Sequence, residues 1–188
     1  IPGYNEGEAS TVECWEFLGN GDLMCLFKES DYTTIDESGD PRWMSAFEGR
    51  YPDGNEDYTN LKVLTDWIVS TDSTAATNAT LPSPVTYAGT VYNTDSAAYR
   101  LAKFKAEVAV HFNMDFLTSY YLLTESFGMV DQRAKNMMFA YFEDKITHVG
   151  KWYPIYYDGD TILGVRNDGK LKSSYEVSEE TYDPELSD

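Results

Sequence analysis

The chain has 188 residues, the size of one ordinary domain, and its 42% hydrophobic and 15% aromatic content argues against disorder of the whole. Its 32 acidic residues against 14 Lys and Arg give a formal charge of −18, which repels nucleic acid and anionic membranes in the absence of a basic patch. No apolar run approaches the about 20 residues that span a bilayer. We therefore expect one folded acidic domain, residues 1–188, without a nucleic-acid partner or a membrane span.

The first portion, residues 1–56, is predicted to be rich in strands. Short apolar runs alternate there with turn residues, and residues 14–27 read as a hairpin around Gly19-Asn20-Gly21. A further strand is expected in residues 42–52, RWMSAFEGRYP.

Two cysteines, Cys14 and Cys25, lack the CxxC companions of a zinc site. Their spacing leaves two states open, core thiols or one disulfide. The sequon Asn78-Ala79-Thr80 is a short pattern that arises often by chance, so the compartment stays open as well.

Residues 57–128 are predicted to be mainly helical. In NEDYTNLKVLTDWIVS the apolar residues recur at helical intervals, which predicts one buried face. The residues of this face are Leu61, Leu64, Trp67 and Ile68. Residues 70–95 are rich in Ser, Thr, Ala and Pro, and they read as a long surface insertion with one small hairpin at VTYAGTVY.

Two more helices are expected after this insertion. The first follows three N-cap candidates, Thr94, Asp95 and Ser96. Its predicted buried side consists of Tyr99, Ala102, Ala106, Ala109 and Val110. The second helix lies in MDFLTSYYLLTESFG and is expected to end at Gly128. Its predicted core stripe consists of Phe116, Tyr120, Leu123 and Phe127.

In residues 129–172 the spacing of apolar residues changes from a helical period to one typical of strands. NMMFAYFE and KWYPIYYD read as two strands joined by a loop at residues 144–150, and RNDGK reads as a tight turn. Residues 173–188 are a polar, acidic tail. The fold class that follows is α+β, with helices packed on a small antiparallel hairpin sheet. Because the chain begins at Ile1 and not Met, we also expect it to be a fragment of a longer protein.

Asp131 and Asn136 stand five apart, directly after a predicted helix and directly before a predicted strand. Asp-x-x-x-x-Asn is the spacing of the catalytic loop in kinase-type phosphoryl transferases, where Asp orients the attacking hydroxyl and Asn holds a metal ion. Arg133 and Lys135 lie inside this loop, where either contacts the transferred phosphate or serves as a solvated base among acids.

A second acidic pair, Asp158 and Asp160, follows the last aromatic strand. Residues i and i+2 of an extended segment point to the same side, so both carboxylates can face one cation, and hard oxygen ligands suit Mg²⁺ or Mn²⁺. A calcium loop starting at Asp158 fails because its fifth and twelfth positions are Ile162 and Gly169. The remaining alternative is that these acids are turn and cap residues without a ligand.

From Phe47 to about Gly164 the chain resembles the C-terminal lobe of the CotH family of atypical, spore-coat protein kinases. The resemblance lies in FEGRYP, FNMDFLTSYYLLTES, DQRAKN and GKWYPIYYDGDTILG, in this order. It implies a protein-kinase-like fold and phosphoryl transfer from ATP, with Mg²⁺ or Mn²⁺, to a protein hydroxyl. It further implies that Asp131 is the catalytic-loop Asp, Asn136 a metal ligand, and Asp158 or Asp160 the other metal-binding acid.

A complete kinase-like enzyme also needs a covering N-lobe with a Lys on the nucleotide phosphates, and neither a Gly-rich loop nor a Val-Ala-x-Lys strand precedes the helices. The first hypothesis is therefore an enzyme whose partner is a missing N-terminal half of the same protein. The second is a non-catalytic structural or interaction domain that keeps the fold, within a phage virion or tail or a secreted surface protein. A virion or extracellular location is favoured over the cytoplasm, with neighbouring subunits of the assembly as partners.

Overall fold

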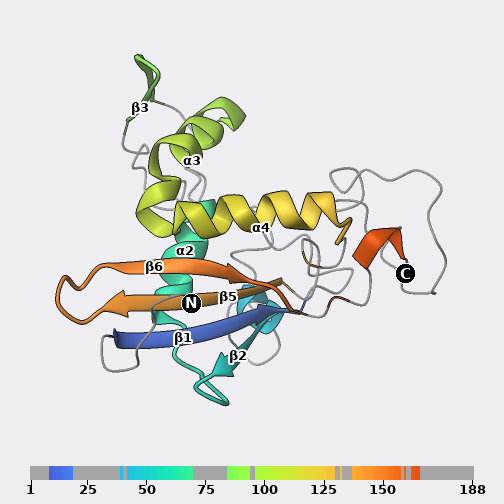
Figure 1. Cartoon of the computed structure of the whole chain (residues 1–188). Helices are drawn as coiled ribbons and strands as arrows, with labels where there is room; N and C mark the ends of the chain where they lie inside the picture. The colour runs from blue at the N-terminus through green and yellow to red at the C-terminus, as the bar shows by residue number, and fades with distance from the viewer. Residues whose placement is uncertain are drawn as a thin grey trace.

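The computed structural model describes residues 9–18, 39, 42–69, 84–93, 96–129, 132, 137–157, 159 and 162–165. These residues form a mixture of α-helices and antiparallel strands (Figure 1). The expected α+β class is confirmed at this level.

Four strands form the main sheet, in the order β2-β1-β5-β6. They are β1 (Ala9–Phe17), β2 (Phe47–Tyr51), β5 (Met137–Asp144) and β6 (Gly150–Ile155). The β5–β6 hairpin and its connecting loop confirm the prediction for this part of the chain. The expected hairpin within residues 14–27 is wrong for Cys14–Phe17, because β2 and β5 already pair with the two sides of β1 there. Residues 19–38 lie outside the described part.

The main sheet presents one face to the helices, because side chains alternate along each strand. Trp15 of β1 stands opposite Phe139 of β5, and Tyr141 stands opposite Trp152 of β6. All four belong to, or pack against, one apolar cluster with helix α2 (Thr59–Val69). The apolar alternation of β1 therefore buries Trp15 and Phe17 between the sheet and this helix.

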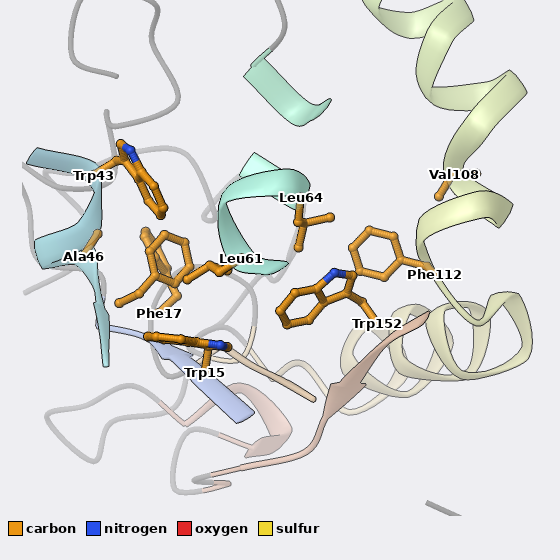
Figure 2. Packing of buried hydrophobic residues seen from close by; sticks show 10 residues of the cluster. Trp15, Phe17, Trp43, Ala46, Leu61, Leu64, Val108, Phe112 and Trp152 are labelled. Carbon is orange, nitrogen blue, oxygen red and sulfur yellow. The ribbon is translucent and has the colours of Figure 1, made fainter. Parts of the chain in front are cut away.

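The core cluster runs from β2 across the sheet to the junction of the last two helices. Figure 2 shows one group of side chains around Trp15 and Leu61 and a second around Trp152 and Leu64. The buried members are Trp15, Phe17, Trp43, Ala46, Phe47, Leu61, Leu64, Val108, Phe112 and Trp152. Trp43 and Ala46 lie in a short 3-10 helix, η3 (Arg42–Ala46), that precedes β2.

Helix α3 (Ala97–His111) begins as predicted, since the side chain of Ser96 accepts a hydrogen bond from the backbone N–H of Tyr99. The hairpin expected in the insertion is also present, as β3 (Val85–Tyr87) and β4 (Thr90–Tyr92). It packs on α3 through a small second cluster of Val85, Tyr99 and Ala102. Residues 70–83, 94 and 95 of the insertion lie outside the described part.

The buried side of α3 differs from the predicted one. Tyr99 and Ala102 are buried as expected, but Ala106, Ala109 and Val110 are exposed. Lys103 is buried instead, because its ammonium donates to the last turn of α2 at the carbonyl of Trp67 and lies over that ring. A cation that caps a helix C-terminus thus replaces apolar packing. On α2, Leu61 and Leu64 are buried, whereas Ile68 is 39% exposed.

Helix α4 (Met114–Ser126) starts at Asn113, whose side chain accepts from the N–H of Phe116, and runs along β6 (Figure 1). Of the predicted core stripe, Tyr120 is buried and Phe116 is half-buried against Tyr153. Leu123 and Phe127 are exposed by 41% and 43%, so the prediction is wrong for these two. Thr124 takes the buried position, with its hydroxyl bonded to the carbonyl of Tyr120.

The thiol of Cys14 is free, and burial raises its pKa to about 11, which keeps it protonated at neutral pH. Cys25, the other half of the possible disulfide, lies outside the described residues. The predicted turn at RNDGK and the acidic tail 173–188 lie outside them too.

Candidate functional site

All six predicted site residues lie outside the described part of the chain. They are Asp131, Arg133, Lys135, Asn136, Asp158 and Asp160. Their immediate neighbours in the sequence are described, namely Gln132 between Asp131 and Arg133, Met137 after Asn136, and Tyr157 and Gly159 around Asp158. The structure therefore describes the neighbours of the predicted site residues.

The two predicted segments are joined by a hydrogen bond. The backbone N–H of Tyr157 donates to the side-chain Oε1 of Gln132 at 3.0 Å. Gln132 follows Asp131, and Tyr157 precedes Asp158, so the bonded pair lies one residue from each of the two predicted acids. The bond therefore brings residue 132 and the chain just beyond β6 together.

The start of β5 lies at the same end of the hairpin. Met138 is paired with Ile155, the last residue of β6, and Met137 is the first residue of β5. Asn136 directly precedes this strand in the sequence. The first residue of β5 and the last residue of β6 thus lie at the end of the hairpin that is opposite its turn.

The C-terminal half of α4 holds this end of the hairpin. The hydroxyl of Tyr120 donates to the backbone carbonyl of Gln132, and its ring lies 5.1 Å from the ring of Tyr156. Seven residues further on, the carbonyl of Phe127 accepts from the N–H of Leu163 at 2.5 Å. Leu163 belongs to η6 (Ile162–Gly164), which Figure 1 shows near the C-terminal end of α4. One helix therefore contacts the chain on both sides of residues 158–160.

The sequence explains why α4 stops where it does. Gly128 adopts a positive φ of 56°, which favours glycine, and its N–H donates to the carbonyl of Glu125. The N–H of Met129 donates to the carbonyl of Thr124 at 2.8 Å, and together these bonds form a Schellman motif. Met129 is buried beyond it. The chain consequently leaves the helix in a fixed direction, two residues before Asp131.

Positively and negatively charged side chains both lie near this end of the sheet. Arg50 of β2 is bonded through its guanidinium to the buried Glu16 at 2.5 Å and to Glu48 at 2.9 Å. The hydrogen bond to Glu16 is the main cause that raises the pKa of Arg50, and Tyr157 also contributes. Burial raises the pKa of Tyr156. A paired cation therefore lies within electrostatic range of Tyr157.

The donor set of the predicted residues suits a divalent cation. Asp131, Asn136, Asp158 and Asp160 offer carboxylate and amide oxygens, which are the ligands of Mg²⁺ and Mn²⁺. Within the described residues alone, no group of three or more His, Cys, Asp or Glu is arranged to hold a metal ion.

Sequence reasoning did not single out Gln132 or Tyr157, and it predicted Tyr120 only as a core residue. Gln132 lies in the middle of the predicted catalytic loop, yet a single Gln between charged residues reads as solvent-exposed. Its complete burial follows from contacts with residues 12 and 25 positions away. The one local signal was its place directly after a helix stop and before an aromatic strand.

Comparisons with known proteins place the chain in no group: no family model matches it, no curated protein matches its sequence, and no solved structure matches its fold. Among the helices that the structure describes, none is long and apolar enough to cross a membrane.

Proposed function

We propose that the chain is a kinase-like C-terminal lobe that takes part in metal-dependent phosphoryl transfer from ATP to a protein hydroxyl. The observation that supports this best is the hydrogen bond between Gln132 and Tyr157. It joins the Asp-x-x-x-x-Asn segment to the Asp-x-Asp segment, and phosphoryl transfer needs these two kinds of residue in one site.

Each residue has a stated role in the proposal. Asp131 accepts a hydrogen bond from the acceptor hydroxyl and orients it, while Asn136 holds the metal together with Asp158 or Asp160. Arg133 or Lys135 contacts the transferred phosphate. Mg²⁺ or Mn²⁺, when bound with ATP, neutralises charge on the transferred group. The contribution of the protein is then positioning and electrostatics, as is general for this reaction.

The test is transfer of labelled phosphate from ATP by the protein at its full natural length. Asp131→Ala is expected to lower the rate by at least about 10²-fold, since it removes the group that orients the hydroxyl. Asp158→Ala is expected to weaken Mn²⁺ binding as well. Asp53→Ala, at an exposed acid in the turn after β2, is the matched control and should change neither. Equal rates in wild type and Asp131→Ala would contradict the proposal.

A second candidate function is a structural or interaction domain, supported by exposed apolar side chains on α3 and α4. Leu101 is 54% exposed, Val110 62% and Leu122 56%. Exposed apolar side chains can take part in contacts with a neighbouring subunit. On this alternative the chain packs against neighbouring subunits of an assembly.

Leu122→Lys separates this candidate from the enzyme. It places a charge at an exposed position of α4 and is expected to release the chain from the assembly, as measured by sedimentation, while leaving the transfer rate unchanged. A chain that is free and monomeric, and that turns over ATP, would contradict the structural role.

A further inference from the structure

The last residue of α3, His111, packs on the last turn of α2. Its ring is stacked on the indole ring of Trp67, with the two centroids 4.2 Å apart and an angle of 29° between the planes. The indole N–H of the same Trp67 donates to Oε2 of Glu107 at 2.9 Å, and Glu107 lies one turn before His111 on α3. One indole ring therefore connects α2 to α3 through a stack and a hydrogen bond.

Charged groups act on His111 from α3 and from β6. Lys103 of α3 donates to the backbone carbonyl of Trp67, and Lys151 of β6 donates to two carbonyls in the last turn of α3, at 2.5 and 2.7 Å. Both ammonium groups thus cap helix C-termini, where positive charge is favoured. The third charged group is the carboxylate of Glu107. From α2, His111 faces the uncharged indole ring.

These surroundings keep the imidazole of His111 mainly neutral at pH 7. Burial lowers its pKa below the ordinary value of 6.5; Glu107 raises the pKa, and the ammonium groups of Lys151 and Lys103 lower it. A folded-state pKa below the unfolded value means that the unfolded chain binds the proton more tightly. The stabilisation is therefore complete above pH 6.5 and is lost as the pH falls through the lowered pKa.

We propose that His111, Trp67 and Glu107 form a pH-sensitive contact between α2 and α3, in which Glu107 changes its partner. When His111 is neutral, Glu107 accepts the hydrogen bond from the indole of Trp67. Protonated His111 is a cation four residues after Glu107 on the same helix, which is the favourable order for such a pair. The carboxylate then turns to the imidazolium and releases the indole N–H. Acidification thereby loosens the attachment of α3 to α2.

The test follows His111 and the indole N–H of Trp67 by NMR in the full chain, from about pH 7.5 to about pH 4.5. We expect His111 to titrate below pH 6.5. With the same midpoint, the protection of the indole N–H from exchange with water should fall about fivefold, as for the loss of one hydrogen bond. In His111→Gln this protection should stay constant. A wild-type indole whose protection does not change with pH, or a change that persists in His111→Gln, would overturn the proposal.

The control is His148→Asn, at the other of the two His residues of the chain. The side chain of His148 is 70% exposed between β5 and β6, and Asn tolerates its positive φ of 53°. This variant should leave the response of Trp67 to pH unchanged. Loss of the response in His148→Asn would contradict the assignment of the response to His111.

Glu107→Gln tests the change of partner directly, and it decides should His111→Gln not fold. It keeps an oxygen acceptor for the indole N–H but offers no charge to the imidazolium. The protection of Trp67 should therefore no longer fall with pH, although His111 still titrates. If it falls as in wild type, Glu107 does not change partner and the proposal is wrong. A wild-type His111 that titrates above pH 6.5 would also overturn it, because acid would then strengthen the stack.

Discussion

The two ends of the β5–β6 hairpin are held in different ways. At the turn, Oδ1 of Asp144 accepts from the N–H groups of Ile146 and Thr147 and from the Thr147 hydroxyl, at 2.6–2.9 Å. All of these partners lie within three residues of Asp144. At the opposite end, Gln132 and Tyr157 are 25 residues apart, and Phe127 and Leu163 are 36 residues apart. The turn is therefore closed by local bonds, and the other end is closed by distant parts of the chain.

The two ends also differ in the kind of side chain that accepts the hydrogen bonds. The hydrogen bonds from Thr147 lower the pKa of Asp144, because they stabilise its charged carboxylate within the turn. At the opposite end the acceptor for the backbone N–H of Tyr157 is a neutral amide. A neutral acceptor next to predicted acids supports the chain without adding a negative charge.

The largest effect is expected where the two ends are connected, at Trp152 in the middle of β6. Trp152 is 3% exposed, packs against Tyr141, and forms a bridge to Phe112. Trp152→Ala should destabilise the protein by about 3–5 kcal/mol. Amide hydrogen exchange should show that both ends of the hairpin lose protection together. Val149→Ala, at a half-exposed residue of the same hairpin, should change stability by less than about 0.5 kcal/mol.

A glycine at each end gives the next comparison. A Cβ at Gly150, beside the turn, would lie 1.8 Å from the hydroxyl of Tyr141, whose ring is packed on Trp152. Gly150→Ala should therefore cost about 1–3 kcal/mol in denaturant unfolding, since the ring must move. Gly159→Ala is the control at the other end, because nothing lies within 4 Å of its added Cβ. Equal costs for the two variants would contradict the packing at Gly150.

Tyr120→Phe is a change restricted to the end of the β5–β6 hairpin that is opposite its turn. It removes one hydroxyl donor from the carbonyl of Gln132 and leaves the ring contact with Tyr156 intact. We expect a loss of roughly 1–2 kcal/mol. Exchange protection should fall at Tyr157 and not at Thr147. The control is Tyr51→Phe, at a ring that is 47% exposed. A uniform loss of protection along the hairpin would show that its two ends are not independent.

Local signals explain which parts of the fold could be predicted from the sequence. Ser96 and Gly128 mark helix ends through bonds within a few residues, and both positions were predicted. The partners of β1 could not be predicted, because its pairing bridges at least 30 residues to β2 and at least 120 residues to β5. The buried side of α3 was wrong for a similar reason, since Lys103 is buried through its bond to a different helix.

For the candidate site, the spacing of Asp131 and Asn136 and the pair of Asp158 and Asp160 predicted which segments to compare. The connection between these segments could not be predicted, because it depends on the length of one Gln side chain and on a backbone N–H beyond the end of β6. Hydrophobic periodicity carries no information on such a contact. Gln132 could be identified only once α4 and β6 were placed beside each other.

The smallest expected effect concerns the charge of Asp144, at the turn end of the β5–β6 hairpin. Because hydrogen bonds hold the pKa of Asp144 below its ordinary value of 3.8, the carboxylate stabilises the folded chain at pH values above this. That contribution is lost as the pH falls through the lowered pKa of the folded state. Asp144→Asn should therefore melt below wild type at pH 7, and the difference in melting temperature should shrink below about pH 4. Asp53→Asn, at an exposed turn acid, is the control. A difference that persists undiminished at about pH 2.5 would mean that the shape of the side chain, and not its charge, closes the turn.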